Sequence, residues 1–276
     1  MFGGITARGR LLVLAHAGSR GEVFVWDLAE AARRNHFTYE GQGGGYADAG
    51  GVALSRDSTL YLADTRNSSV RCFSLFGQEL AQIGGPCGIP RDRRGLLAHP
   101  RALCLDRHER LWVTCGDRPW VHGLQVFDRD GSFLFSAMAF GERNRSFGPS
   151  LGLCRIEEEV WVADTGNLCL QFFREDGSFV AAMPLLDAGR PMAPLAVSPF
   201  GNGLAVLLRT DVDPCRIYDR HLKEQGRLTL PAGESFRSPS GLATLEGGEL
   251  LVLDADGERV LEFRGSGDFD CVRFEL

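Results

Sequence analysis

Short apolar runs separated by polar turns recur along the chain. The clearest unit lies in residues 50–73, and the same order returns in residues 152–173. In the first unit the apolar runs are Val52–Leu54, Leu60–Ala63 and Val70–Phe73. Runs of this length, bounded by Asp, Asn, Ser and Gly, are typical of β-strands joined by tight turns. A strand pattern that returns at long spacing predicts a repeat architecture.

The repeat occurs six times when the chain is aligned on the second run of each unit. These second runs are Leu11–Leu14, Leu60–Ala63, Leu111–Thr114, Val160–Ala163, Leu204–Leu207 and Leu250–Leu253. Their starts lie 44 to 51 residues apart, and each has one strand-like run before it and two after it. Only Leu28–Arg34 has a pattern that suits a helical turn. Six units of four antiparallel strands predict an all-β fold, a six-bladed β-propeller.

We expect one domain over residues 1–276, because a single blade cannot bury both of its faces and becomes stable when stacked in a ring. The blades are expected at roughly residues 1–42, 43–86, 87–140, 141–187, 188–232 and 233–276. Asp130-Gly131 and Asp176-Gly177 predict hairpins. In the fifth blade, Arg227–Leu230 is the expected fourth strand. The pattern leaves open whether an exchanged N-terminal strand closes the ring.

Two of the units resemble NHL repeats. Residues 52–83 and 153–183 share a small apolar first strand, an aromatic residue in the second strand and the turn sequence Ala-Asp-Thr-x-Asn. The third and sixth units match in part, and the first and fifth have diverged. The resemblance implies a propeller over essentially the whole chain. NHL propellers serve as protein-, ligand- or RNA-binding modules and a minority of related propellers are enzymes, so the resemblance does not select one activity.

Composition and charge narrow the class of protein. The chain has 44% hydrophobic and 24% charged residues, as soluble globular proteins do. No apolar run approaches the roughly 20 residues that cross a bilayer, and no signal-peptide core begins the chain. We therefore expect a cytoplasmic protein with no membrane partner and no cofactor. The eight cysteines form no Cys-x-x-Cys pair, which is typical of free thiols in a reducing compartment.

Two sets of side chains share repeat positions. The first set, which follows second strands, is Asp64, Asp164 and Asp254. A carboxylate there can accept backbone hydrogen bonds in the adjoining turn, so we interpret these residues as turn-forming rather than catalytic or metal-binding. The second set, within second strands, is Tyr61, Trp112 and Trp161. We expect these rings to pack between blades rather than to stack on nucleic-acid bases.

The links between blades carry charged residues that are not part of the repeat. In a propeller, the link from the fourth strand of one blade to the first strand of the next lies on one face, around the channel mouth. The links here contain arginine and are stiffened by proline. The candidate partner-binding residues on and beside them are Arg91, Arg93, Arg94, His99, Arg101, Arg143, Arg145, Arg190 and Arg237. The opposite face is expected to be acidic, with Glu157–Glu159 and Glu175-Asp176 in its turns.

These features favour a non-catalytic scaffold that binds a protein or peptide through its arginine-bearing face, because the guanidinium fork suits carboxylates. A simpler alternative is that the arginines pair with acids of their own links, namely Asp92, Glu142, Asp187 and Glu234. Another is a metal-dependent hydrolase or lyase in the channel, for which only His99 and Asp48 are candidate ligands. A third is RNA binding, against which the net charge of -6 weighs. No catalytic or metal-binding residue is predicted.

Overall fold

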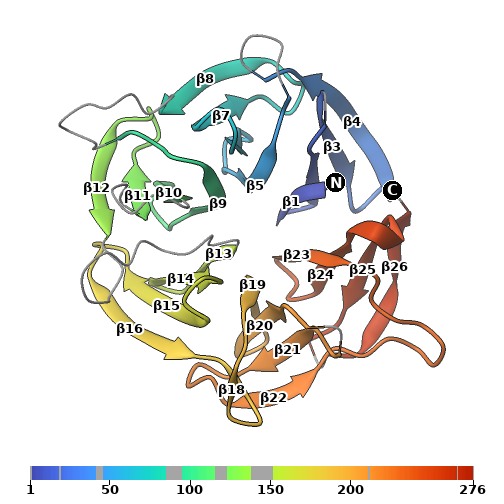
Figure 1. Ribbon diagram of the computed structural model, residues 1–276. Helices are drawn as coiled ribbons and strands as arrows, with labels where there is room; N and C mark the ends of the chain where they lie inside the picture. The colour runs from blue at the N-terminus through green and yellow to red at the C-terminus, as the bar shows by residue number, and fades with distance from the viewer. Residues whose placement is uncertain are drawn as a thin grey trace.

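Six four-stranded antiparallel sheets form a ring in the computed structural model (Figure 1). The structure describes residues 2–18, 20–41, 46–84, 95–115, 123–137, 152–210, 212–265 and 267–275. Within each of the six sheets, neighbouring strands are consecutive in the sequence. The predicted all-β, six-bladed β-propeller is confirmed.

Each blade runs outward from the axis through its first, second, third and fourth strand. The first strands are β1 (Phe2–Arg8), β5 (Ala49–Leu54), β9 (Pro100–Leu105), β13 (Gly152–Ile156), β19 (Pro194–Phe200) and β23 (Pro239–Thr244). The second strands are β2 (Leu11–His16), β6 (Leu60–Asp64), β10 (Leu111–Cys115), β14 (Glu159–Asp164), β20 (Gly203–Leu208) and β24 (Leu250–Asp254). The third strands are β3 (Gly21–Asp27), β7 (Ser69–Phe73), β11 (Leu124–Phe127), β15 (Cys169–Arg174), β21 (Cys215–Tyr218) and β25 (Arg259–Phe263). The fourth strands are β4 (Ala32–Tyr39), β8 (Glu79–Gly84), β12 (Phe133–Ala137), β16 (Phe179–Pro184), β22 (Glu224–Arg227) and β26 (Phe269–Glu275).

Small residues let the first strands of neighbouring blades approach one another. A Cβ atom added at Gly152 would lie 2.6 Å from the Cα atom of Ala196 in the next blade. One added at Gly51 would lie 2.8 Å from the carbonyl oxygen of Arg101. Both distances are too short for carbon contacts, so a side chain at either position would push the blades apart. This requirement explains the glycine and alanine of the strands nearest the axis.

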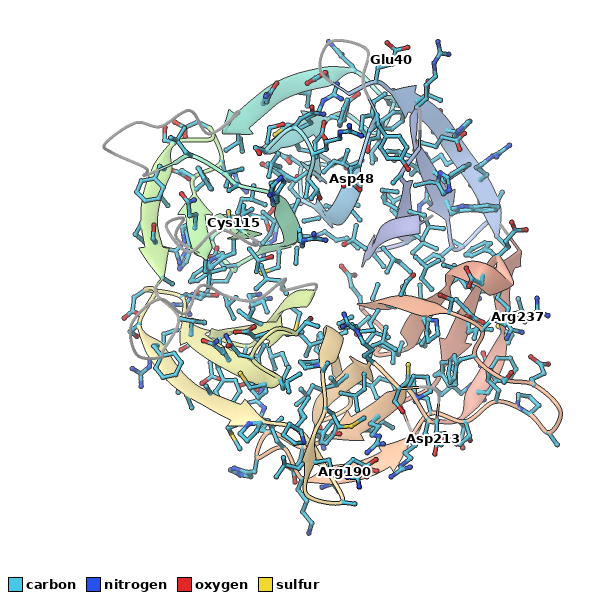
Figure 2. All side chains as sticks on the ribbon, in the orientation of Figure 1. Glu40, Asp48, Cys115, Arg190, Asp213 and Arg237 are labelled. Atoms are coloured by element: carbon cyan, nitrogen blue, oxygen red, sulfur yellow. The ribbon has the colours of Figure 1, made fainter. Side chains whose placement is uncertain are left out.

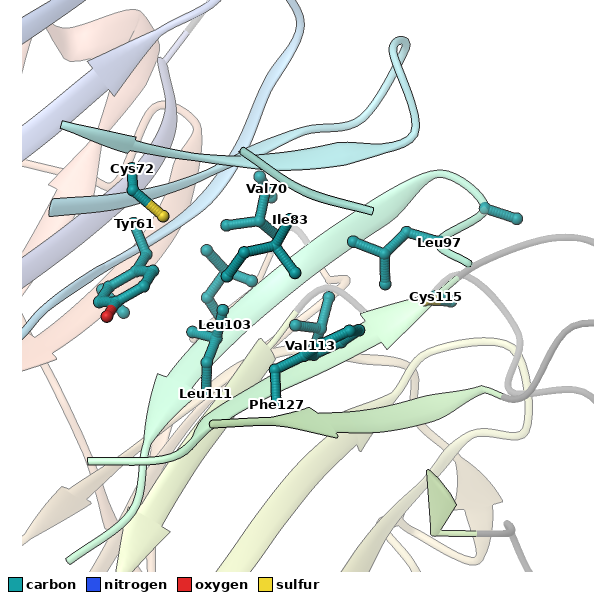
Figure 3. Packing of buried hydrophobic residues seen from close by; sticks show 13 residues of the cluster. Tyr61, Val70, Cys72, Ile83, Leu97, Leu103, Leu111, Val113, Cys115 and Phe127 are labelled. Carbon is teal, nitrogen blue, oxygen red and sulfur yellow. The ribbon is translucent and has the colours of Figure 1, made fainter. Parts of the chain in front are cut away.

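The hydrophobic core is divided among the interfaces between blades. Successive side chains of a strand point to opposite faces of the sheet, so each buried second strand packs against both neighbouring blades. Figure 3 shows one interface, where Tyr61 and Val70 of the second blade join a cluster with Leu103 of the third. Tyr61, Trp112 and Trp161 are at most 5% exposed and belong to three such clusters. The expectation that these rings pack between blades is confirmed.

Packing between the first and last blades closes the ring. Strands β1–β4 and β23–β26 are each a complete sheet of consecutive strands, so no strand is exchanged between these two blades. Figure 1 shows the two blades side by side. Buried Ile5, Leu14 and Leu253 belong to the apolar cluster that joins them. The Arg273 guanidinium also donates to the carbonyl oxygen of Leu28 at 2.9 Å.

Two local predictions are wrong. The fourth strand of the fifth blade is Glu224–Arg227 and not Arg227–Leu230. Its tight turn fixes the earlier start, because the backbone N–H of Asp219 donates to the carbonyl of Lys223 at 3.0 Å. This outermost strand is largely exposed and therefore needs no apolar alternation. The segment Leu28–Arg34 is not helical, since a turn leads directly into β4 at Ala32.

The two Asp-Gly hairpins form where the sequence predicts them. Gly131 adopts a φ of 84°, which a glycine tolerates without strain. The carboxylate of Asp130 accepts a hydrogen bond from the backbone N–H of Ser132 at 2.9 Å. Gly177 repeats the arrangement with a φ of 86°.

Candidate functional site

The topology gives the ring two faces. One carries the links between blades and the turns between second and third strands, and we call it the link face. The other carries the turns between first and second strands and between third and fourth strands, and we call it the turn face. The predicted partner-binding residues that the structure describes belong to the link face.

Four of the predicted partner-binding residues lie within the described part of the chain. Those outside it are Arg91, Arg93, Arg94, Arg143 and Arg145. Arg101 lies in β9, beside the axis, and His99 directly precedes that strand. Figure 2 places Arg190 and Arg237 toward the outside of the ring. The four described residues are therefore spread over the link face and do not converge on one point.

Arg190 lies in a hairpin that the sequence did not predict. Strands β17 (Leu186–Asp187) and β18 (Arg190–Pro191) pair within the link between the fourth and fifth blades. The carboxylate of Asp187 accepts a hydrogen bond from the buried Arg216 guanidinium at 2.8 Å. This contact holds the pKa of Asp187 below its usual value. Because Asp187 is bound to Arg216, it does not neutralise the exposed Arg190 side chain.

Arg237 lies in the link between the fifth and sixth blades. The backbone N–H groups of Arg237 and Ser238 donate to Asp254 Oδ1 at 2.9 and 2.7 Å, which fixes the backbone of the link. The acidic residue of the same link, Glu234, pairs with Arg259 at 2.9 Å. The Arg237 side chain is exposed, and no carboxylate in the described part of the chain pairs with it.

Arg101 is held beside the axis by a fixed backbone. The Thr65 hydroxyl of the second blade donates to the carbonyl oxygen of Pro100 at 2.7 Å. The Nε atom of Arg101 is buried without a hydrogen-bond partner, and none of the described carboxylates pairs with the guanidinium. His99 is partly buried and adopts a left-handed φ of 46°. A positive charge that pairs with none of the described carboxylates thus lies at the inner part of the link face.

The three aspartates at the shared repeat position are fully buried. The carboxylate of Asp164 accepts hydrogen bonds from the backbone N–H of Asn167 at 3.1 Å and from the Gln171 side chain at 2.6 Å. Burial raises the pKa of Asp64, and hydrogen bonds from Asn67 oppose that rise. Asp64 and Asp164 thus bind residues of the turn that follows each of them, as interpreted, whereas Asp254 binds the backbone of the link that precedes its blade.

A central cavity of about 300 Å³ opens at the turn face. Side chains of all six first strands line it, and Arg8, Arg56 and Arg155 border it. The sequence pattern did not predict this site, although Arg8 and Arg155 both lie near the ends of first strands. The acids expected on this face do lie in its turns, as at Glu157 and Glu175, but Glu157 pairs with Arg220 at 2.7 Å and arginines border the cavity.

The described residues contain little else that is chemically reactive. Among them, no group of three or more His, Cys, Asp or Glu side chains is placed to hold a metal ion. Their cysteines are free thiols, buried except for partly exposed Cys271, as predicted; Cys87 lies outside the described residues. Burial raises the pKa of Cys72 and Cys169 to about 12. No helix in the described ranges is long and apolar enough to cross a bilayer.

No protein-family model matches the chain, and no curated protein matches it. Solved structures do match. A chain of a nidogen/laminin complex is 15% identical with a TM-score of 0.64, over 94% of this chain and 91% of that one. A protein of unknown function from Bacteroides caccae is 12% identical with a TM-score of 0.66, over 96% of both chains. Virginiamycin B lyase from Staphylococcus aureus is 13% identical with a TM-score of 0.59, over 81% of this chain and 69% of that one.

This chain shares the propeller fold of those proteins. At such low identity the likeness concerns the fold alone, because one fold supports many activities.

Proposed function

We propose that this chain is a non-catalytic, NHL-type β-propeller whose link face binds an acidic segment of a protein partner. One observation carries the proposal. Arg190 and Arg237 are exposed on separate links, while the acids that would neutralise them, Asp187 and Glu234, are bound to Arg216 and Arg259. The contacts therefore do not support the alternative in which these two arginines pair with acids of their own links.

The wide spacing of the charges favours a macromolecular partner. Arg101 lies beside the axis, and Arg190 and Arg237 lie toward the outside of the ring (Figure 2). A small anion would contact one of these guanidinium groups, whereas a protein interface covers about 800 Å² on each partner. Each guanidinium can bind a carboxylate through two parallel hydrogen bonds. The resemblance of residues 52–83 and 153–183 to NHL repeats agrees with a binding module.

Selection from a random peptide library displayed on phage tests this proposal with defined ligands. Wild-type protein is expected to select peptides enriched in Asp and Glu. The double variant Arg190→Gln with Arg237→Gln should bind these peptides about tenfold more weakly, since two exposed ion pairs together contribute roughly 1 to 2 kcal/mol. Binding should also weaken as salt concentration rises. The melting temperature of the variant should equal that of the wild type.

The matched control is Arg174→Gln with Arg220→Gln, which removes the same charge from exposed positions on the turn face. It should bind the peptides as the wild type does. Selected peptides without acidic enrichment, or equal losses in both double variants, would contradict the proposal. An RNA oligonucleotide that binds in place of the peptides and shows the same dependence on Arg190 and Arg237 would favour the RNA-binding alternative instead.

A further inference from the structure

The central cavity lies on the side of the ring away from the proposed protein-binding surface. Its lining includes the turn-face ends of first strands, represented by Arg8, Leu54 and Thr244, and the turn residues Arg56 and Asp106. The link-face ends of the same strands are not part of the lining. A cavity of about 300 Å³ is at the lower end of the size range of small-molecule sites. It is therefore a separate site with its own mouth.

Two arginines stand at corresponding positions on opposite sides of this mouth. Arg8 pairs in register with Leu11, and Arg155 pairs with Val160, at the same point of the first and fourth blades. Blades three positions apart in a ring of six face each other across the axis (Figure 1). Both side chains line the same cavity, so positive charge borders it from two opposite sides.

Arg155 has no acidic partner in the described part of the chain. Its side chain is exposed, and its guanidinium donates to the carbonyl oxygen of Glu157 at 2.7 Å. The Glu157 carboxylate is bound by both terminal nitrogens of Arg220, each at 2.7 Å. The nearest acid in the sequence is thus occupied, and the charge of Arg155 remains available to a ligand.

The charges on the other side of the mouth are also unbalanced. Arg8 pairs with Glu109 at 3.0 Å, and Arg56 pairs with the same carboxylate at 3.5 Å. Glu109 is only 3% exposed and is the acid that these two arginines share. Asp106 also lines the cavity, but its carboxylate pairs with Arg110 at 2.6 Å. Three guanidinium groups therefore border the cavity against one shared carboxylate.

Aliphatic residues also border the cavity behind the arginines, although most of its exposed surface is polar. Leu105, Leu153, Val197 and Leu242 line the cavity from four first strands. Two of the hydroxyl groups that line the cavity, those of Ser198 and Thr244, share a hydrogen bond of 2.7 Å. A short aliphatic chain would contact these aliphatic side chains, while an anionic group would remain at the charged mouth.

We propose that the cavity binds a small amphipathic oxyanion, with a carboxylate or phosphate group at Arg155 and Arg8 and an aliphatic part between the first strands. The guanidinium fork fits both kinds of oxyanion. The site does not depend on the link face, so a ligand in the cavity and a protein on the link face could be bound together.

Titration calorimetry with four ligands of equal chain length tests this site: hexanoate, hexyl phosphate, 1-hexanol and hexylamine. At least one of the two anions is expected to bind with a dissociation constant in about the millimolar range, given its few atoms. The alcohol and the amine should bind at least about tenfold more weakly, and the tighter of the two anions identifies the preferred head group. Equal binding of all four ligands, or no binding of either anion at about 10 mM, would overturn the proposal.

Two variants locate the site. Arg155→Gln should weaken anion binding about tenfold, whereas Arg209→Gln, which removes an exposed arginine from the link face, should leave it unchanged. Thr6→Phe should fill the cavity and abolish binding of the aliphatic anions. Wild-type affinity in Arg155→Gln would contradict the proposed role of that guanidinium. Retained binding in a folded Thr6→Phe variant would place the ligand outside the cavity.

Discussion

At the scale of single residues, Asp254 is a buried residue at the shared repeat position, and its hydrogen bonds reach the link face. The sequence predicted that an aspartate here accepts hydrogen bonds in the turn that follows, because the chemistry of short polar side chains next to strands is usually local. Its actual partners could not be predicted. The carboxylate accepts hydrogen bonds from the backbone of Arg237 and Ser238, which precede it by 17 and 16 residues, and from Arg259. A single buried carboxylate therefore positions the link that carries Arg237.

Asp254→Ala should lower the free energy of unfolding by about 3 kcal/mol, because it leaves two backbone N–H groups and the Nε of Arg259 without their acceptor. Urea denaturation measures the change. Asp256→Ala, at an exposed position in the adjoining 3-10 turn, should change the free energy by no more than about 0.5 kcal/mol. A loss below about 1 kcal/mol for Asp254→Ala would show that water replaces the carboxylate.

For the arginines around the cavity, the sequence predicts the position in the repeat but not whether the charge is free to bind a ligand. Arg8 and Arg155 can be aligned by their repeat position, but their availability depends on which acids are already bound. Glu157 is occupied by Arg220, which is 63 residues away in the sequence. Such pairing is a product of tertiary structure, and no local pattern reveals it.

At the scale of secondary-structure elements, one buried side chain links the β17–β18 hairpin to the fifth blade. Arg216, in the third strand of the fifth blade, is 1% exposed and binds both Asp187 and Glu224. It thereby ties the hairpin to the fourth strand of the same blade. The sequence predicted neither this hairpin nor the bounds of β22, because β22 is polar and exposed and the hairpin is short. Apolar periodicity carries information about buried strands only.

Protection of the hairpin from hydrogen exchange should depend on pH. The lowered folded-state pKa of Asp187 means that its ion pair stabilises the hairpin above the unfolded pKa of about 4 and is lost as pH falls through the folded value. The backbone N–H of Met192, which donates to Leu185 at 2.8 Å, should therefore lose protection in acid, after correction for intrinsic exchange rates.

Asp187→Asn should remove this pH dependence and reduce Met192 protection already at neutral pH. Asp213→Asn is the control, because Asp213 pairs with Arg227 outside the hairpin. Unchanged Met192 protection in Asp187→Asn would show that the ion pair does not hold the hairpin.

At the scale of the whole molecule, contacts between two complete blades close the ring, and no strand is exchanged between them. The join between the first and last blades contains Leu14 and Leu253, both fully buried. Other neighbouring blades are also connected by the chain itself. The number of blades and the order of strands followed from the sequence, because buried second strands repeat at regular spacing. The mode of closure did not follow, because a local pattern does not indicate how the two ends of the chain meet.

Leu253→Ala should lower the free energy of unfolding by about 3 kcal/mol through lost burial and the cavity left behind. Leu62→Ala, at an equally buried position between the first and second blades, should cost a similar amount. Hydrogen exchange should then distinguish the two variants. Leu253→Ala should expose amides of β1 and β26 to faster exchange, whereas Leu62→Ala should not affect β26. Identical exchange patterns in the two variants would contradict the inference that the ring closes between the first and last blades.

The central claim is that the link face binds an acidic protein segment, and photo-crosslinking of a selected acidic peptide to the wild-type protein tests it most directly. A photoreactive group on the peptide, followed by mass spectrometry of the crosslinked fragments, locates the contact. We predict crosslinks in the links that contain Arg190 and Arg237, and their loss in the Arg190→Gln, Arg237→Gln variant. Crosslinks confined to the turn face or to the outer strands would contradict the claim.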